Sequence, residues 1–107
     1  MLKKVLRITL MERFALLAKV EAKPGKEKQV SDFLKSALPL AEAEPDTLRW
    51  YGLQISESTF GIFDTFETDS ARKAHLQGEI AAALMANADE LFSAIPSIEF
   101  VDILAVK

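Results

Sequence analysis

Cysteine is absent from this sequence, and only one of its 107 residues is histidine. The chain therefore has no disulfide, no thiolate nucleophile, no zinc ribbon and no cysteine-held iron–sulfur cluster. One histidine cannot build a multi-histidine metal site, so metal binding would have to rest on carboxylates. We predict no metal site.

An excess of positive charge and a long apolar run are also missing. Lys and Arg number 13 against 16 Asp and Glu, and a net charge of −3 does not attract nucleic acid or anionic lipid. No segment approaches the roughly 20 apolar residues of a membrane span. The basic opening is like that of a signal peptide, but Arg7, Glu12 and Arg13 interrupt its apolar region. We expect a cytoplasmic protein that binds neither nucleic acid nor membrane.

Apolar residues, by contrast, make up 50% of the chain, and the mean hydropathy is +0.12. The length fits one domain, which we place at residues 14–107 after an N-terminal extension or arm at residues 1–13. A domain of this size buries roughly 65% of the surface of its unfolded chain. Some of the apolar surplus should therefore line a pocket or a subunit interface.

The apolar pattern predicts strands and helices in a definite order. Residues 14–22 alternate as a half-buried strand, and an amphipathic helix follows, with a break near Pro39. Residues 47–56 and 59–67 are rich in aromatic and β-branched side chains and predict a hairpin. A helical region capped at Thr68, Asp69 or Ser70 and weakened at Gly78 ends before Pro96. Residues 98–106 form the last strand.

This β-α-β-β-α-β order is that of a ferredoxin-like α+β fold, a four-stranded antiparallel sheet with its helices on one face. The other face is left uncovered in a monomer. Apolar side chains lie on both faces of the predicted strands, among them Leu17, Leu53, Ile55, Phe63, Val101 and Ile103. We therefore predict a homodimer formed through the sheet face.

Three segments stand out by their order and spacing: KPGKEKQV at the first helix, AEPDTLRWYGLQ leading into the second strand, and FGIFDTFETDSARKAHL, an aromatic strand that leads into a helix. Together they resemble the antibiotic biosynthesis monooxygenase (ABM) family of dimeric α+β barrel proteins. The resemblance covers residues 14–106 and implies a dimer with a ligand pocket between sheet and helices.

The resemblance also implies a chemistry. Enzymes of that family oxidise electron-rich phenols or quinols with O₂ and use no metal, flavin or haem, because the deprotonated substrate can itself give an electron to O₂. We therefore predict a cofactor-independent monooxygenase acting on a small aromatic or quinol-type substrate. A non-catalytic small-molecule binding or stress-response module and an acid/base isomerase are the alternatives, because a fold alone does not separate them.

Two side chains are the candidate catalytic residues. His75 alone has an unperturbed pKa near neutrality, and the resemblance places it beside the pocket, where it would take or shuttle a phenolic proton. The alternative is a buried histidine bonded to a strand carbonyl or carboxylate. Asp64 lies in an apolar strand and needs a donor, for which His75, Arg49 and Arg72 are available. An ion pair that fixes the dimer or a helix is the alternative for Asp64.

The hairpin supplies the candidate residues for a pocket that holds a small aromatic or quinone-like ligand. They are Arg49, Trp50, Tyr51, Phe60, Phe63 and Phe66. Alternation sends Trp50 to the face opposite Arg49 and Tyr51, and it separates Phe63 from Phe60 and Phe66. These side chains therefore cannot all line one cavity, and ordinary core packing is the alternative for some of them.

A haem-degrading branch shares this fold. Resemblance to that branch would call for Asn, Trp and His where this chain has Ala18, Phe66 and Met85. We predict no haem degradation, because no imidazole is placed to ligate iron.

Overall fold

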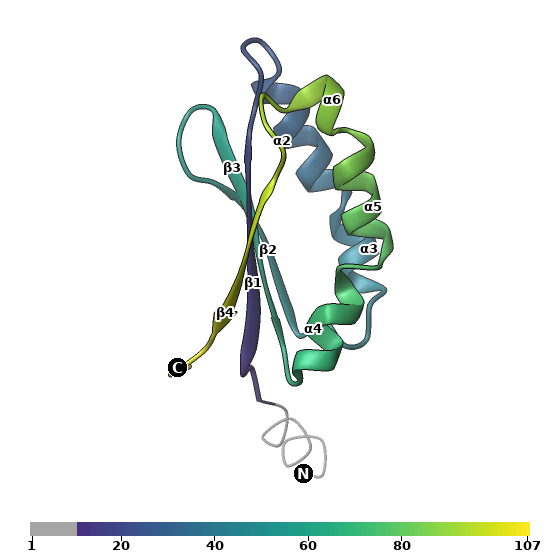
Figure 1. The fold of residues 1–107 in the computed structure, drawn as a ribbon, viewed down its shortest axis with the longest axis vertical. Coiled ribbons are helices and arrows are strands. Elements are labelled where there is room, and N and C mark those ends of the chain that lie inside the picture. Colours follow the sequence, from purple (N-terminus) through teal and green to yellow (C-terminus); the bar gives the residue numbers. More distant parts are fainter. Residues whose placement is uncertain (1–10) are drawn as a thin grey trace.

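The computed structural model describes residues 11–107, which form a four-stranded antiparallel sheet with all of their helices on one face (Figure 1). The strand order is β2-β3-β1-β4, so the predicted ferredoxin-like α+β fold is confirmed. Residues 1–10, the larger part of the predicted N-terminal extension, lie outside the described residues. The elements are β1 (Phe14–Glu21), α2 (Glu27–Ser36), α3 (Leu38–Glu42), β2 (Arg49–Gln54), β3 (Thr59–Phe66), α4 (Asp69–His75), α5 (Glu79–Ala86), α6 (Ala88–Leu91) and β4 (Ser97–Asp102).

Both helical regions are divided, as the sequence predicted. α2 ends at Ser36 and α3 starts at Leu38, so Pro39 lies in the first turn of a new helix, where its missing N–H costs nothing. Thr68 caps α4 by accepting a hydrogen bond of 3.1 Å from the backbone N–H of Ala71. Gly78 separates α4 from α5.

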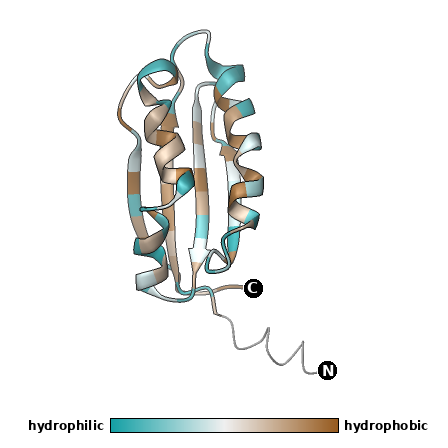
Figure 2. Ribbon diagram, turned by 90° about the vertical axis from the view of Figure 1, so that its right-hand side faces the viewer, coloured by the Kyte–Doolittle hydropathy of each residue, from teal (hydrophilic) through white to brown (hydrophobic). Residues whose placement is uncertain are grey.

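The hydrophobic core lies between the sheet and the helices. Figure 2 views the molecule from the helix side and shows hydrophobic stretches of the strands beneath the helices. Alternate residues of β1 and β3 face this core, and α2 and α5 cover them. The buried set includes Ala18, Val20, Phe60, Ile62, Val30, Leu34, Ile80 and Leu84.

The last strand is shorter than predicted. The alternating pattern extends to residue 106, but β4 ends at Asp102. Its partner β1 begins at Phe14, which pairs with Asp102, and one further hydrogen bond of 2.9 Å joins Ile103 N–H to the carbonyl of Arg13. Leu104 is 97% exposed, because β1 offers no further residue to pair with.

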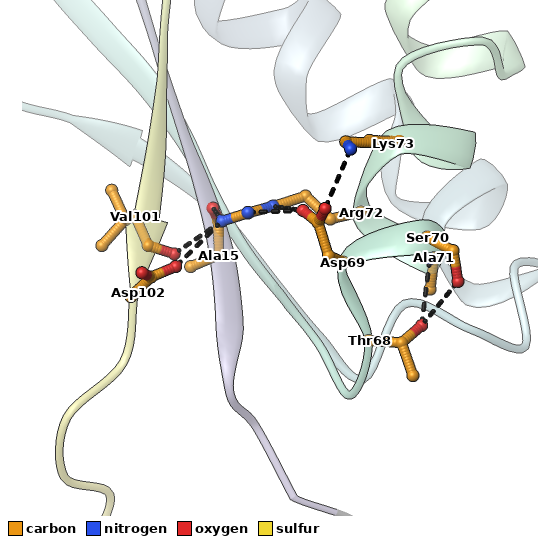
Figure 3. A network of polar contacts seen from close by, with 9 residues as sticks. All are labelled: Ala15, Thr68, Asp69, Ser70, Ala71, Arg72, Lys73, Val101 and Asp102. Carbon is orange, nitrogen blue, oxygen red and sulfur yellow. Dashed lines mark hydrogen bonds and ion pairs between the residues drawn. The ribbon is translucent and has the colours of Figure 1, made fainter.

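Arg72 ties α4 to the sheet (Figure 3). Its side chain is only 8% exposed, and its guanidinium donates to the carbonyl oxygens of Val101 at 3.0 Å and Ala15 at 3.4 Å. It also pairs with Asp69 on its own helix and with Asp102 at the end of β4. One buried cation thus joins α4, β1 and β4.

Two aromatic rings complete the surroundings of this cation. The guanidinium carbon of Arg72 lies 5.0 Å from the ring centre of Phe14 and 4.8 Å from that of Phe100. His75 follows Arg72 by three residues and therefore lies on the same side of α4, one turn further along. Anchoring Arg72 on the sheet also fixes the position of His75.

Candidate functional site

His75 lies between two carboxylates. Its Nε2 is 2.8 Å from Oδ2 of Asp64 on β3, and its Nδ1 is 2.6 Å from Oε1 of Glu44 in the α3–β2 connection. The same Glu44 oxygen accepts a 2.8 Å hydrogen bond from the hydroxyl of Thr47. The side chains are 2% exposed for Asp64, 7% for His75 and 25% for Glu44. These three residues form a chain from the sheet to the surface, which we call the His75 cluster.

Two members of the His75 cluster, Asp64 and His75, hold protons more strongly than they would in isolation. Burial raises the pKa of the Asp64 carboxyl above its usual 3.8, although the hydrogen bond with His75 acts in the opposite direction. Burial also disfavours a charged His75, but hydrogen bonds and charges from Asp64 and Glu44 outweigh it and raise the pKa of His75 above the usual 6.5. A neutral imidazole donates from one nitrogen only, so an imidazolium best satisfies both carboxylates.

Two buried polar atoms near the His75 cluster have no hydrogen-bond partner among residues 11–107. They are the second carboxylate oxygen of Asp64, Oδ1, and the indole Nε1 of Trp50. Trp50 and Asp64 are directly opposite each other in the β2–β3 register and share the helix-facing side of the sheet. Asp64 is therefore buried with one carboxylate oxygen unsatisfied, and this burial is what raises its pKa.

A cleft of about 350 Å³ opens beside His75 and Glu44. We call it the His75 cleft; its volume lies in the range of small-molecule sites. Much of its wall consists of small or apolar residues from α3 and the connection that follows it, and from α4 and the turn that follows it. Among them are Leu40, Ala43, Pro45, Ala71, Ala74 and Gly78. The cleft therefore has a largely apolar wall, and Glu44 and His75 of the His75 cluster lie at its side.

Two further clefts follow β2, and Trp50 and Tyr51 line both. One, of about 390 Å³, lies beside α3 and shares Glu44 and Thr47 with the His75 cleft. The other, of about 540 Å³, lies between α2 and β2 and reaches Phe60. Glu44 thus separates the His75 cleft from a groove that runs along the edge strand.

The register divides the predicted pocket residues between the two faces of the sheet. Trp50 pairs with Asp64, and both Phe60 and Phe66 lie on that helix-facing side. The Phe66 ring lies 5.3 Å from the imidazole of His75, measured between ring centres. Arg49, Tyr51 and Phe63 lie on the uncovered face, where the Tyr51 and Phe63 rings are 6.4 Å apart.

Of the three partners predicted for Asp64, the structure selects His75. Arg49 lies on the other face and pairs with Glu12, with Nε 3.6 Å from Oε2. Arg72 is occupied by Asp69, Asp102 and two backbone carbonyls. Asp102, a further carboxylate at the end of β4, therefore belongs to the network that anchors α4.

Glu44 was not among the predicted site residues. It is 31 positions from His75 and lies in the connection after α3, where sequence spacing gives no sign of a contact with α4. The available signal was its place in AEPDT, an acid at the end of a helix just before the hairpin that carries Asp64. Tertiary packing, rather than periodicity, brings the two acids to one imidazole.

Within residues 11–107, no group of three or more His, Asp or Glu side chains is placed to hold one metal ion. In the same part of the chain, no helix has the length and apolar character that a membrane crossing requires.

The fold is that of a known structural class. A proposed antibiotic biosynthesis monooxygenase from Nitrosomonas europaea superposes with a TM-score of 0.75 at 13% identity, over 87% of this chain and 91% of that one. Another, from Chloroflexus aurantiacus J-10-fl, gives 0.68 at 18% identity, over 89% and 96%. This chain therefore has the fold of the ABM-like proteins, as the sequence predicted. No protein-family model matches it, and a search of curated proteins found no match.

A much more similar solved structure is the protein NE2512 of unknown function from Nitrosomonas europaea. It is 54% identical, with a TM-score of 0.88, and the match covers 92% of this chain and 95% of that one. The chain belongs to the same family as NE2512.

Proposed function

We propose that this protein is a cofactor-independent monooxygenase that oxidises a small aromatic or quinol-type substrate with O₂. The observation that carries the proposal is the His75 cluster, which holds an exchangeable proton beside an apolar cleft of about 350 Å³. Oxidation of a quinol by O₂ needs a group that takes a proton and a site that excludes water. The ABM-like fold and its proposed monooxygenases support the same reaction.

The chemistry balances without another reductant. A quinol hydroxyl gives its proton to the His75 cluster, and the quinolate passes one electron to O₂, which forms a semiquinone and superoxide. These combine at a ring carbon that bears hydrogen and form a C–O bond. That hydrogen then leaves as a proton to bulk water while the O–O bond breaks, which leaves a carbonyl and hydroxide. The hydroxide takes the proton held by the cluster and departs as water. The substrate supplies all four electrons that O₂ accepts.

Oxygen uptake with a panel of quinols tests this proposal. We expect the wild-type protein to exceed the uncatalysed rate, and the His75→Ala variant to lose about a hundredfold or more of the excess. Lys73→Ala is a matched control, because Lys73 lies on the same helix with its side chain 67% exposed. Turnover that continues without oxygen would instead indicate an acid/base isomerase. Ligand binding with no uptake would indicate a non-catalytic binding module.

We also propose that two copies associate through the uncovered sheet face. Half-buried apolar side chains gather there, including Leu17, Leu53, Phe63 and Val101, and Tyr51 is 48% exposed. Surfaces of this kind are costly to leave in water.

The mass of the protein in solution, measured by light scattering after size exclusion, tests this assembly. We expect wild type to be a dimer and Phe63→Asp to be a monomer. Met85→Asp should remain dimeric, because Met85 is 54% exposed on α5, on the helix side of the molecule. A wild-type monomer would contradict the proposal.

A further inference from the structure

We infer that Glu44 is the member of the His75 cluster that meets the substrate, and that the His75 cleft takes an uncharged hydroxylated aromatic in preference to an anionic one. This inference rests on the proposed function, since it concerns the same site. It adds a catalytic residue and a charge class for the substrate.

Exposure within the cluster distinguishes its three members. Glu44 is 25% exposed and lines the cleft, whereas Asp64 is 2% exposed and does not. Oε1 of Glu44 is taken by His75 and Thr47, and no described residue donates a hydrogen bond to Oε2. A methyl group at Gly78 would lie 3.5 Å from Oε2, so glycine keeps the space beside this oxygen open. A ligand hydroxyl in the cleft can therefore donate to Oε2.

His75 is badly placed to take the substrate proton itself. Both of its ring nitrogens already face carboxylate oxygens, at 2.6 and 2.8 Å, so neither offers a lone pair to the cleft. The Glu44 carboxylate is the acceptor that remains. A proton arriving on Oε2 neutralises Glu44, while Nδ1 of His75 holds the carboxyl in place at Oε1 and Asp64 holds the far side of the imidazole. In this arrangement Glu44 contacts the substrate and His75 and Asp64 are positioning residues.

The charges around the cleft determine which ligands it accepts. Three acids line it, namely Glu44, Asp46 and Glu79. Among the described lining residues His75 is the one basic side chain, and two carboxylates already neutralise it. An anionic group such as a carboxylate or sulfonate would meet like charges at short range, and like-charge contacts disfavour binding. A neutral ring with a hydroxyl instead packs against the apolar wall and can donate a hydrogen bond to Oε2 of Glu44.

A matched pair of probes tests this inference without turnover. We would titrate the protein under argon with a neutral naphthohydroquinone and with its sulfonated analogue. The NMR signal of the imidazole reports binding at the site, because His75 is the only histidine. We expect the neutral probe to bind about tenfold or more tightly than the sulfonate. Glu44→Gln, which keeps the shape and removes the charge, should weaken binding of the neutral probe about tenfold.

Glu90→Gln removes the same charge from an exposed position on α6 and should leave both affinities unchanged. Equal or tighter binding of the sulfonate, an unaffected Glu44→Gln protein, or binding of neither probe would overturn the inference. The wild-type comparison needs no variant and therefore stands even if Glu44→Gln fails to fold. Selective binding without oxygen uptake would refute the monooxygenase alone, whereas uptake with an unaffected Glu44→Gln protein would refute the role of Glu44 alone.

Discussion

Replacing Arg72 by alanine should cost the fold about 3 kcal/mol. The contacts with two aromatic rings contribute about 0.5–1 kcal/mol each. The charged hydrogen bond to the Val101 carbonyl, at 3.0 Å, contributes about 1.5–3 kcal/mol. The ion pairs add little, because Asp69 and Asp102 are 39% and 74% exposed and regain water when the arginine is removed. Most of the lost stability therefore comes from the contacts of the buried guanidinium with the two rings and the carbonyl, and little of it comes from the ion pairs.

Urea unfolding measures this loss directly. With a denaturant slope of about 1.5 kcal/mol per molar urea, the midpoint of Arg72→Ala should fall by about 2 M. Lys73→Ala is the matched reference, because Lys73 also pairs with Asp69, at 3.0 Å, but is 67% exposed. Its loss should stay below about 0.5 kcal/mol. Equal midpoint shifts for the two variants would refute the argument that burial makes Arg72 an anchor.

Two further predictions concern pH and close packing. Because the pKa of His75 is raised in the fold, its stabilising contribution is complete below 6.5 and is lost as pH rises through the raised value. Urea midpoints should therefore decline over this interval in wild type but not in His75→Gln, and identical pH profiles would contradict the assignment. A methyl group at Gly61 would lie 2.9 Å from the carbonyl oxygen of Ala18, so Gly61→Ala should cost about 1–3 kcal/mol. At Gly52 the nearest atoms are 3.6 Å away, and Gly52→Ala should change the unfolding free energy by less than about 0.5 kcal/mol; equal losses would contradict the close approach.

The fold could be predicted from local signals because they agree with the tertiary structure. Apolar alternation located β1 and β3, and Pro39 marked the division between α2 and α3. The error at the C-terminus has a physical cause. Alternation continues to residue 106, but a strand exists only where a neighbour can pair with it, and β1 begins at Phe14. The end of β4 depends on β1, which lies more than 80 residues earlier in the chain.

The site was less accessible to sequence reasoning. Asp64 and His75 are 11 residues apart on a strand and the helix that follows, so their contact was one of the arrangements that the sequence allowed. Alternation also showed that Trp50 and Tyr51 point to opposite faces. Glu44 differs because its contact with His75 depends on how the α3–β2 connection packs against α4. No periodicity describes that packing, and the third member of the cluster was therefore missed.

The alternation of β2 has a consequence for how such a protein can change over time. Trp50 and Gly52 face the helices, while Arg49, Tyr51 and Leu53 face the uncovered side of the sheet. Because β2 is an edge strand, residues of both sets nevertheless line the clefts beside it, Tyr51 and Leu53 among them. A substitution at Tyr51 therefore changes a cleft wall and the uncovered surface together. One six-residue strand thus couples changes in ligand preference to changes in the surface that is open for association.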